Sequence, residues 1–131
     1  MLKKEVARGP HGRVLIMGSI TQLVPADAGC IAVSSSHGGI SSGEYALAVP
    51  LCLAVFNDAG GGKDGAGIAA LAMLQARGVG AVTVAHTSAR IGDAQDTWDS
   101  GLVSHVNETA QAMGLAPGQR LQPALMRVIG A

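Results

Sequence analysis

Three stretches of the chain share one layout, in which an apolar run is followed at once by a polar, glycine-rich cluster. They span residues 31–39, 51–65 and 82–93. A buried strand that ends in Ser, His, Asp and Gly is typical of open α/β sheets, where ligands bind outside the carboxyl ends of parallel strands. The layout therefore predicts a site at one edge of a sheet, and it does so before any reaction can be named.

The first polar cluster reads Ser-Ser-Ser-His-Gly-Gly and ends the stretch 31–39. The imidazole of His37 can act as a general acid or base near neutral pH, and Ser36 beside it is a candidate nucleophile. Ser35, Gly38 and Gly39 are candidate substrate-binding residues. The cluster lacks the G-x-S-x-G elbow, which disfavours a serine hydrolase of the α/β type.

The second cluster, residues 57–65, joins a predicted strand to a predicted helix. Backbone N–H groups and the helix dipole favour an anion at such a junction, and Lys63 adds a positive charge. Its glycine spacing differs from that of a P-loop, and Asp64 stands where Ser or Thr would bind magnesium, so a nucleoside triphosphatase is disfavoured. A competing and compatible interpretation makes Asp64 the N-cap of the following helix. The candidate ligands for a carboxylate or a single phosphate are Asn57, Gly61, Gly62 and Lys63.

The third cluster, residues 86–93, begins with a histidine that directly follows a predicted strand. Arg90 can bind a carboxylate with two parallel hydrogen bonds. Thr87, Ser88 and Arg90 are the candidate substrate-binding residues here, and His86 is a candidate catalytic residue.

If these strands are neighbours, His37, Asp58 and His86 line one edge of the sheet. That triplet allows two kinds of chemistry. Asp58 can orient an imidazole for acid/base catalysis, or the three side chains can hold a divalent metal. No H-x-x-x-H or C-x-x-C spacing supports the metal, and a third interpretation gives each histidine a local structural role only.

The elements that would position these clusters follow from apolar runs and breakers. An α/β fold is expected, with three layers and a small, mainly parallel sheet of four or five strands with flanking helices. The expected strands span residues 14–17, 30–35, 51–56 and 79–85. The expected helices span residues 44–49, 66–77 and 94–113. The first strand is expected to be antiparallel or at an edge, because a short link separates it from the next.

The long helix expected over 94–113 affects two assignments. Asp93, Asp96 and Asp99 fall at its start, where the helix dipole favours acidic residues without any metal. His105 falls roughly 15 Å along its axis at 1.5 Å per residue, too far to join the loops of its own chain. A packed or interface histidine is therefore expected at that position.

The whole chain, residues 1–131, is expected to form a single domain. Residues 1–12 are expected to be an extended N-terminal lead-in, and residues 115–131 a C-terminal extension. The apolar stretch 121–129 within this extension is expected to be a helix or edge strand that packs on a neighbouring chain. Charged residues make up only 14% of the sequence, against about 25% in typical soluble domains, which predicts a homo-oligomer.

Composition also excludes some classes of partner. The net charge is zero and no basic stripe is present, so nucleic acid is not an expected partner. The longest apolar run, 45–56, is too short for a bilayer, which needs about 20 residues, and residues 1–12 lack the apolar region of a signal peptide. Cys30 and Cys52 lie in apolar runs, as buried free thiols do, and a cytoplasmic location is expected.

The hypothesis favoured by the sequence is an enzyme that acts on a small anionic metabolite, a carboxylate or a phosphate, by acid/base chemistry, as a hydrolase or a lyase/isomerase. No organic cofactor is expected, because the dinucleotide fingerprint G-x-G-x-x-G is not present in the required form. The alternative is a non-catalytic module that senses or binds a small anion. A third hypothesis is a scaffold whose apolar surface matters more than its loops.

Overall fold

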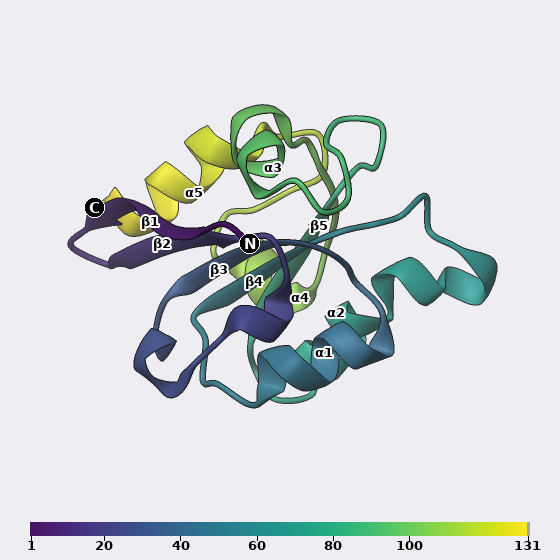
Figure 1. Cartoon of the computed structure of the whole chain (residues 1–131), viewed down its shortest axis with the longest axis horizontal. Helices are drawn as coiled ribbons and strands as arrows, with labels where there is room; N and C mark the ends of the chain where they lie inside the picture. The colour runs from purple at the N-terminus through teal and green to yellow at the C-terminus, as the bar shows by residue number, and fades with distance from the viewer. Residues whose placement is uncertain (131) are drawn as a thin grey trace.

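The computed structural model describes residues 1–130, which form one α/β fold around a six-stranded sheet (Figure 1). The strands lie side by side in the order in which they occur along the chain. The four central strands are parallel, and each edge strand is antiparallel to its neighbour. The strands are β1 (Lys3–Gly9), β2 (Gly12–Met17), β3 (Ile31–His37), β4 (Leu53–Asn57), β5 (Gly80–Val84) and β6 (Val103–Val106).

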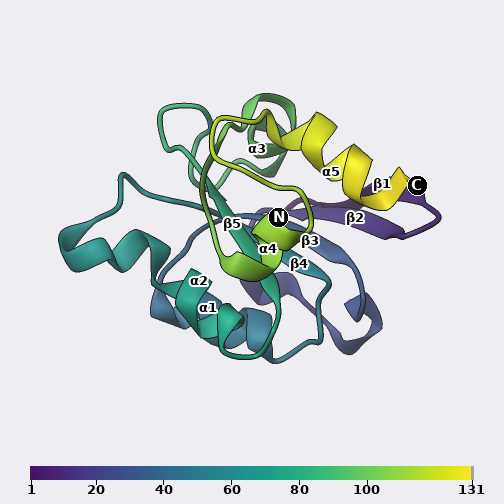
Figure 2. The same cartoon turned by 180° about the vertical axis from the view of Figure 1, so that it is seen from behind.

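Helices cover both faces of this sheet, as the front and back views show (Figures 1 and 2). The α-helices are α1 (Ile40–Leu47), α2 (Ala69–Gln75), α3 (Ala94–Ser100), α4 (Glu108–Ala112) and α5 (Leu121–Gly130). Three short 3₁₀ helices are η1 (Ile20–Gln22), η2 (Pro25–Asp27) and η3 (Lys63–Ile68). The expected α/β class, with a mostly parallel sheet and flanking helices, is confirmed, but the sheet has six strands instead of four or five.

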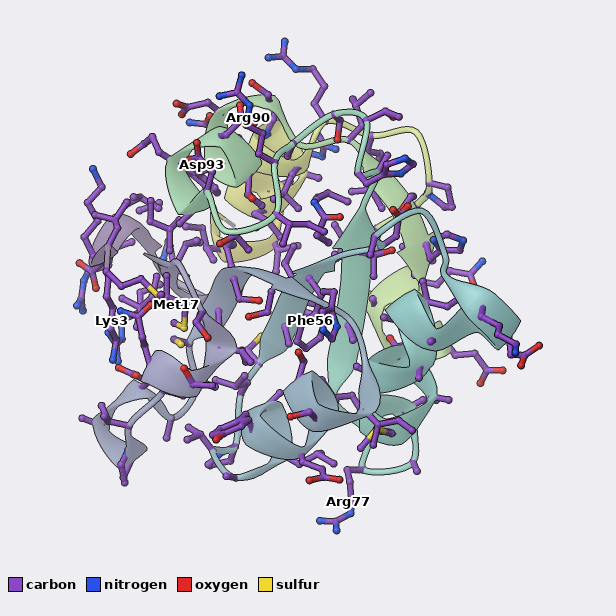
Figure 3. The ribbon with its side chains drawn as sticks, turned by 45° about the vertical axis from the view of Figure 1, so that its right-hand side comes forward. Lys3, Met17, Phe56, Arg77, Arg90 and Asp93 are labelled. Atoms are coloured by element: carbon purple, nitrogen blue, oxygen red, sulfur yellow. The ribbon has the colours of Figure 1, made fainter. Side chains whose placement is uncertain are left out.

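Successive side chains of the central strands belong in turn to two hydrophobic cores, one on each face of the sheet. Val14 and Val55 belong to a core shared with α3 and α5, whereas Met17 and Phe56 belong to one shared with α1 and α2. Figure 3 shows Phe56 among the side chains in the middle of the molecule. Successive side chains of a strand point to opposite faces, so runs that are apolar throughout serve both cores at once.

The order of the strands determines which helices cover which face. Crossovers between parallel strands keep one hand, so sequential strands send their connecting helices to the same face. Both α1, with Ala46, and α2, with Leu74, pack in the same core. The connection after β5 leads to α3, whose Trp98 lies in the opposite core. The connection after β4 therefore covers one face of the sheet and the connection after β5 covers the other. The two connections diverge between the carboxyl ends of these strands.

Residues 3–9, within the expected extended lead-in, form the edge strand β1 and so belong to the sheet. A hairpin pairs β1 with β2, and the outer strand carries Lys3, Lys4 and Glu5. As a result β2 is internal and parallel to β3, although its sequence predicted an edge or antiparallel strand. The link from β2 to β3 contains only the short helices η1 and η2. A parallel connection therefore forms here without a full α-helix.

The expected long helix over 94–113 is also wrong. Gly101 ends α3, and a side chain at this position would collide with the Thr97 carbonyl oxygen and crowd Val84. The chain then forms β6, and Asn107 caps α4 by accepting a hydrogen bond from the N–H of Ala110. A strand therefore stands in the middle of the residues assigned to a single helix.

The apolar stretch 121–129 forms α5 and packs on its own chain. Leu121, Leu125 and Ile129 are buried in the core with the first strands. The His11 N–H donates to the Ile129 carbonyl oxygen at 3.1 Å, which ties this helix to the β1–β2 turn. The buried face of α5 therefore packs on its own chain and not on a neighbouring chain, so the expectation is wrong for this face. Residue 131, the end of the expected extension, lies outside the described residues. Within residues 1–130, no helix is long and apolar enough to cross a membrane.

Candidate functional site

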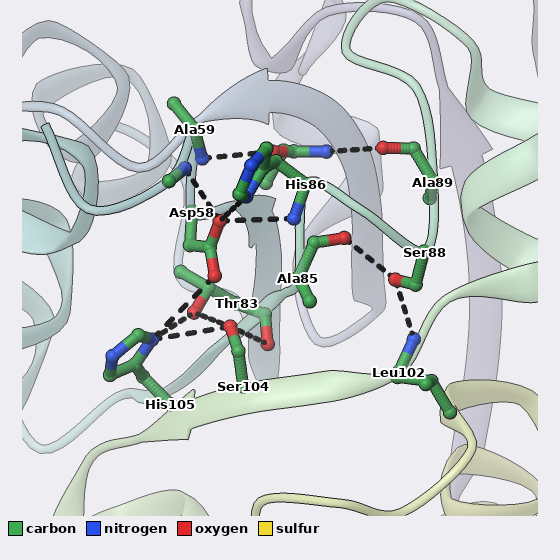
Figure 4. A network of polar contacts seen from close by, with 12 residues as sticks. Asp58, Ala59, Thr83, Ala85, His86, Ser88, Ala89, Leu102, Ser104 and His105 are labelled. Atoms are coloured by element: carbon green, nitrogen blue, oxygen red, sulfur yellow. Dashed lines mark hydrogen bonds and ion pairs between the residues drawn. The ribbon is translucent and has the colours of Figure 1, made fainter.

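A buried carboxylate lies where the chain connections diverge, directly after β4. Oδ1 of Asp58 accepts hydrogen bonds from the N–H of Gly60 at 2.8 Å and from the N–H of His86 at 3.0 Å (Figure 4). The same oxygen lies 3.4 Å from Nδ1 of the His86 ring. The Asp58 side chain is only 8% exposed, whereas the His86 side chain is 52% exposed. One edge of the imidazole therefore faces a fixed negative charge while the rest of the ring reaches solvent.

A second histidine faces the other oxygen of the same carboxylate. Nδ1 of His105, on β6, lies 4.0 Å from Oδ2 of Asp58, and the His105 side chain is 44% exposed. Its Nδ1 is also 3.2 Å from the Thr83 hydroxyl and 3.2 Å from the Ser104 hydroxyl, which are 2.9 Å from each other. The expectation that His105 lies away from the loops of its own chain is wrong, because it sits on a strand beside β5.

The environment of Asp58 favours its ionised form. Burial alone raises the pKa of a carboxyl group. Here the N–H groups of Gly60 and His86, the Ser104 hydroxyl and the charge of His86 outweigh burial and hold the pKa of Asp58 below its ordinary value of 3.8. The site therefore has a permanent negative charge between two imidazoles.

Two glycines keep the backbone close to this carboxylate. A side chain at Gly67 would collide with the carbonyl oxygen of Asp58, so this close approach requires glycine. Gly60 has φ of +77°, and a Cβ there would lie 3.4 Å from the His86 ring. The proposed capping role of Asp64 is wrong, because Asp64 itself has φ of +55°, makes no capping hydrogen bond and precedes α2, whose N-cap is Ile68. The segment with η3 stands out from the body of the molecule in both cartoon views (Figures 1 and 2).

An open hollow of about 290 Å³ lies beside the exposed part of His86. Arg90 lines it, and Figure 3 shows this side chain at the surface near α3. The backbone N–H of Arg90 donates to Oδ2 of Asp96, which fixes the loop there. The residues that line the hollow are His86, Thr87, Ser88, Ala89, Arg90 and Asp96.

Two candidate binding residues are occupied with holding loops. The buried side chain of Asn57 donates to the Ala89 carbonyl at 2.9 Å and accepts from the N–H of Ala59 at 2.9 Å. The Ser88 hydroxyl donates to the Ala85 carbonyl and accepts from the N–H of Leu102. Both side chains therefore position the clusters that follow β4 and β5.

The cluster that follows β3 shares the sheet edge but faces other hollows. His37 pairs with Asn57 across the strands, and its Nδ1 accepts a hydrogen bond from the Gly39 N–H at 3.2 Å. It lines one hollow together with Ser35 and Ser36, and another together with Gly62. Lys63 is exposed on η3. The three polar clusters thus share one edge, but none of the described hollows includes His37, Asp58 and His86 together.

Two of the three acidic residues of α3 serve the backbone. Oδ1 of Asp93 accepts from the N–H of Asp96, as an N-cap does, and Oδ2 of Asp96 accepts from the N–H of Arg90. These two agree with the role expected from the helix dipole, whereas Asp99 lies in the last turn of this short helix and accepts from the side chain of Gln95. In the described part of the chain, no group of three or more His, Cys, Asp or Glu residues is placed to hold a metal ion, and this includes the combination of His37, Asp58 and His86.

His105 and its hydroxyl partners, Thr83 and Ser104, are the site residues that sequence reasoning missed. A signal for them is present in the chain: Gly101 and Asn107 are a helix stop and a helix N-cap, and the residues between them include the β-branched Val103 and Val106. That spacing fits a short strand.

Comparisons with protein-family models, with curated proteins and with solved structures found no match to this chain. The assignment of a function therefore rests on the chemistry of the site.

Proposed function

We propose that this protein is an enzyme that acts on a small anionic metabolite by acid/base chemistry, with His86 as the group that transfers the proton. The observation that carries the proposal is the buried carboxylate of Asp58, which faces Nδ1 of a half-exposed imidazole. The pair lies where neighbouring connections leave the sheet for opposite faces, which is the usual place for ligands in open α/β sheets.

Asp58 is a positioning residue in this proposal. A carboxylate that faces Nδ1 favours the imidazole tautomer with its proton on that nitrogen, and this leaves the Nε2 lone pair free to accept a proton. Once His86 has taken a proton, the same carboxylate stabilises the positive charge of the imidazolium. His105, near the other carboxylate oxygen, provides a second imidazole that can return a proton.

Arg90 supplies the group that would bind the anion. It lines the same hollow as His86, and a guanidinium binds a carboxylate or phosphate through two parallel hydrogen bonds. A proton transfer next to a bound anion is common to hydrolysis, elimination and isomerisation, so we propose a hydrolase or a lyase/isomerase.

We also propose a cytoplasmic homo-oligomer. Both cysteines are free thiols, as expected of a protein in a reducing compartment. Three large side chains, Ile40, Tyr45 and Ile91, are exposed. Ile40 and Tyr45 both lie on α1, and Tyr45 and Ile91 line the same hollow. A second copy of the chain would cover such side chains, and light scattering at micromolar concentration tests this: a monomer would contradict it.

The function is tested by a turnover screen of small carboxylates and phosphate monoesters. With an identified substrate, His86→Ala should lower kcat/KM by about a hundredfold or more, the usual contribution of general acid–base catalysis. Asp58→Asn should lower kcat more than it changes KM, because Asp58 acts through His86. His11→Ala is the matched control, since His11 is exposed on the β1–β2 turn.

Two outcomes would contradict the proposal. Full activity in both His86→Ala and Asp58→Asn would remove these residues from the mechanism. Saturable thermal stabilisation by a metabolite without any turnover would favour the sensing module instead.

A further inference from the structure

The hollow beside His86 is lined by two charged side chains of opposite sign, Arg90 and Asp96. Among the ion pairs of residues 1–130, none includes either of them. The arginines that line another hollow, Arg8 and Arg13, are in contrast both paired with a single glutamate. In the described part of the chain, the cation and the anion beside His86 therefore both lack a partner of opposite charge.

Backbone hydrogen bonds fix the place of the carboxylate before any ligand arrives. The Arg90 N–H donates to Oδ2 of Asp96 at 2.9 Å, and the Asp93 N–H donates to the Arg90 carbonyl oxygen at 3.2 Å. Asp96 also belongs to the first turn of α3, whose N-cap is Asp93. A group that is already held in place loses little conformational entropy when it binds a ligand. The loop after β5 is thus prepared to present its charges.

The size and lining of the hollow indicate a small, polar ligand. Its volume of about 290 Å³ is at the lower end of the range for small-molecule sites, roughly 300–1,000 Å³. The uncharged residues that line it are Thr87, Ser88 and Ala89. None of these offers a large apolar surface, so a ligand with a bulky apolar part would gain little here.

The two charges select among the small anions of the proposed function. A guanidinium binds a carboxylate through two parallel hydrogen bonds, and a carboxylate such as that of Asp96 binds an ammonium group. A phosphate would bring more negative charge close to Asp96, and a simple carboxylate would leave Asp96 unpaired. An amino acid carries one group for each of the two charges.

We infer that the hollow binds a small amino acid, with its carboxylate on Arg90 and its ammonium group on Asp96. The inference rests on the proposed function, because it narrows the anionic group of the substrate at the same site to a carboxylate and adds a cationic group to it. His86 lines the same hollow, so the bound amino acid would lie within its reach.

An NMR titration of the isotopically labelled full chain tests this inference. The ligands are glycine, L-alanine and β-alanine, their analogues without the amino group, acetate and propionate, and inorganic phosphate. L-Alanine methyl ester, in which the carboxylate is blocked, completes the set. At least one amino acid should bind about tenfold more tightly than its analogue, the effect of one hydrogen bond to a charged group. The amide signals of Arg90 and Asp96 should shift during that titration.

Two variants separate the two charges. Asp96→Asn keeps an oxygen for the Arg90 N–H, and it should weaken amino-acid binding about tenfold while propionate binds as well as before or better, because the repulsion is removed. Arg90→Gln should weaken the binding of both. The controls are Asp99→Asn, exposed on the same helix, and Arg77→Gln, which Figure 3 shows on the other side of the molecule from Arg90. Both controls should leave the affinities unchanged.

The Asp58→Asn variant distinguishes this inference from the proposed function. Asp58 does not line the hollow, so the variant should lower turnover and still bind the amino acid. Binding of an amino acid without turnover in any screen would support this inference and contradict the proposed enzyme. Turnover of a phosphate monoester, without a preference for amino acids, would support the enzyme and overturn this inference.

Two further results would overturn the inference. One is that none of the three amino acids binds more tightly than its analogue without the amino group. The other is that folded Asp96→Asn, as judged from its NMR spectrum, binds the amino acid as tightly as the wild type.

Discussion

The Asp58→Asn variant should be less stable than the wild type near neutral pH by about 2 kcal/mol. Asparagine keeps an oxygen where Oδ1 accepts from the N–H groups of Gly60 and His86. Those two bonds change from charge-assisted to neutral, at a loss of about 1 kcal/mol each. For a typical urea dependence of 1–3 kcal/mol per molar, the midpoint of unfolding should fall by roughly 1 M.

The difference in unfolding free energy between the wild type and Asp58→Asn should depend on pH in a defined direction. Since the folded-state pKa of Asp58 is held below 3.8, its ionisation stabilises the fold above that value. The contribution is lost as the pH falls through the lower folded-state pKa, because the native carboxylate then takes up a proton. The gap between wild type and Asp58→Asn should therefore be present near neutral pH and should shrink as the pH falls below 3.8.

Urea titrations followed by fluorescence would measure this gap, because the single tryptophan, Trp98, is buried in one of the two cores. Glu44→Gln is the control, since Glu44 is exposed and its replacement should leave the urea midpoint unchanged at both pH values. A gap of the same size at both pH values, or none near neutrality, would refute the electrostatic account of Asp58.

Three further variants or measurements test other parts of the fold. Asn107→Ala should lower the free energy of unfolding by about 3 kcal/mol, because the mostly buried amide makes four hydrogen bonds to backbone groups, and an unchanged thermal midpoint would contradict this. Gly67→Ala should push the Asp58 backbone away and shift the histidine NMR signals of the site, whereas Gly61→Ala, which meets no neighbouring atom but has φ of +88°, should lower stability without that shift. Burial raises the pKa of the Cys30 thiol to about 11, so iodoacetamide should modify Cys30 only after unfolding, and rapid labelling of the native protein would argue against this burial.

Local patterns predicted the parallel part of the fold well. The apolar runs that became β3, β4 and β5 are bounded by glycine and proline, and α2 ends before Gly78, which has φ of +69°. These features depend on residues that are close together in the sequence, so they can be recognised without a structure. The class of fold follows from them.

The errors arose where long-range contacts decide the structure. The strand predicted over residues 14–17 became internal because residues 3–9, expected only to be an extended lead-in, pair with it. The stripe of apolar residues over 94–113 matched a helical period, but Gly101 must lie against Val84, which stops the helix there. Tertiary packing thus overrode a local periodicity.

The candidate site was predicted in part. The sequence placed Asp58 beside His86, and the structure brings them within 3.4 Å. The sequence could not place His105, because that residue reaches Asp58 only through β6, whose residues also fit the helical period of 94–113. The sequence also could not show that His37 and His86 line different hollows. The path of the loop over residues 85–93 depends on long-range contacts, such as the hydrogen bond that the Gly92 N–H donates to the Ser35 carbonyl oxygen.

The seating of α5 on the first two strands has a consequence for synthesis in the cell. The residues of α5 that shield Val14 and Ile16 on one side leave the ribosome after all six strands of the sheet. A nascent chain can bring β2 to β5 together with α1 and α2 while this opposite side still lacks its cover. We expect the growing polypeptide to be prone to aggregation until residues 121–130 emerge, and to need protection by chaperones during that interval.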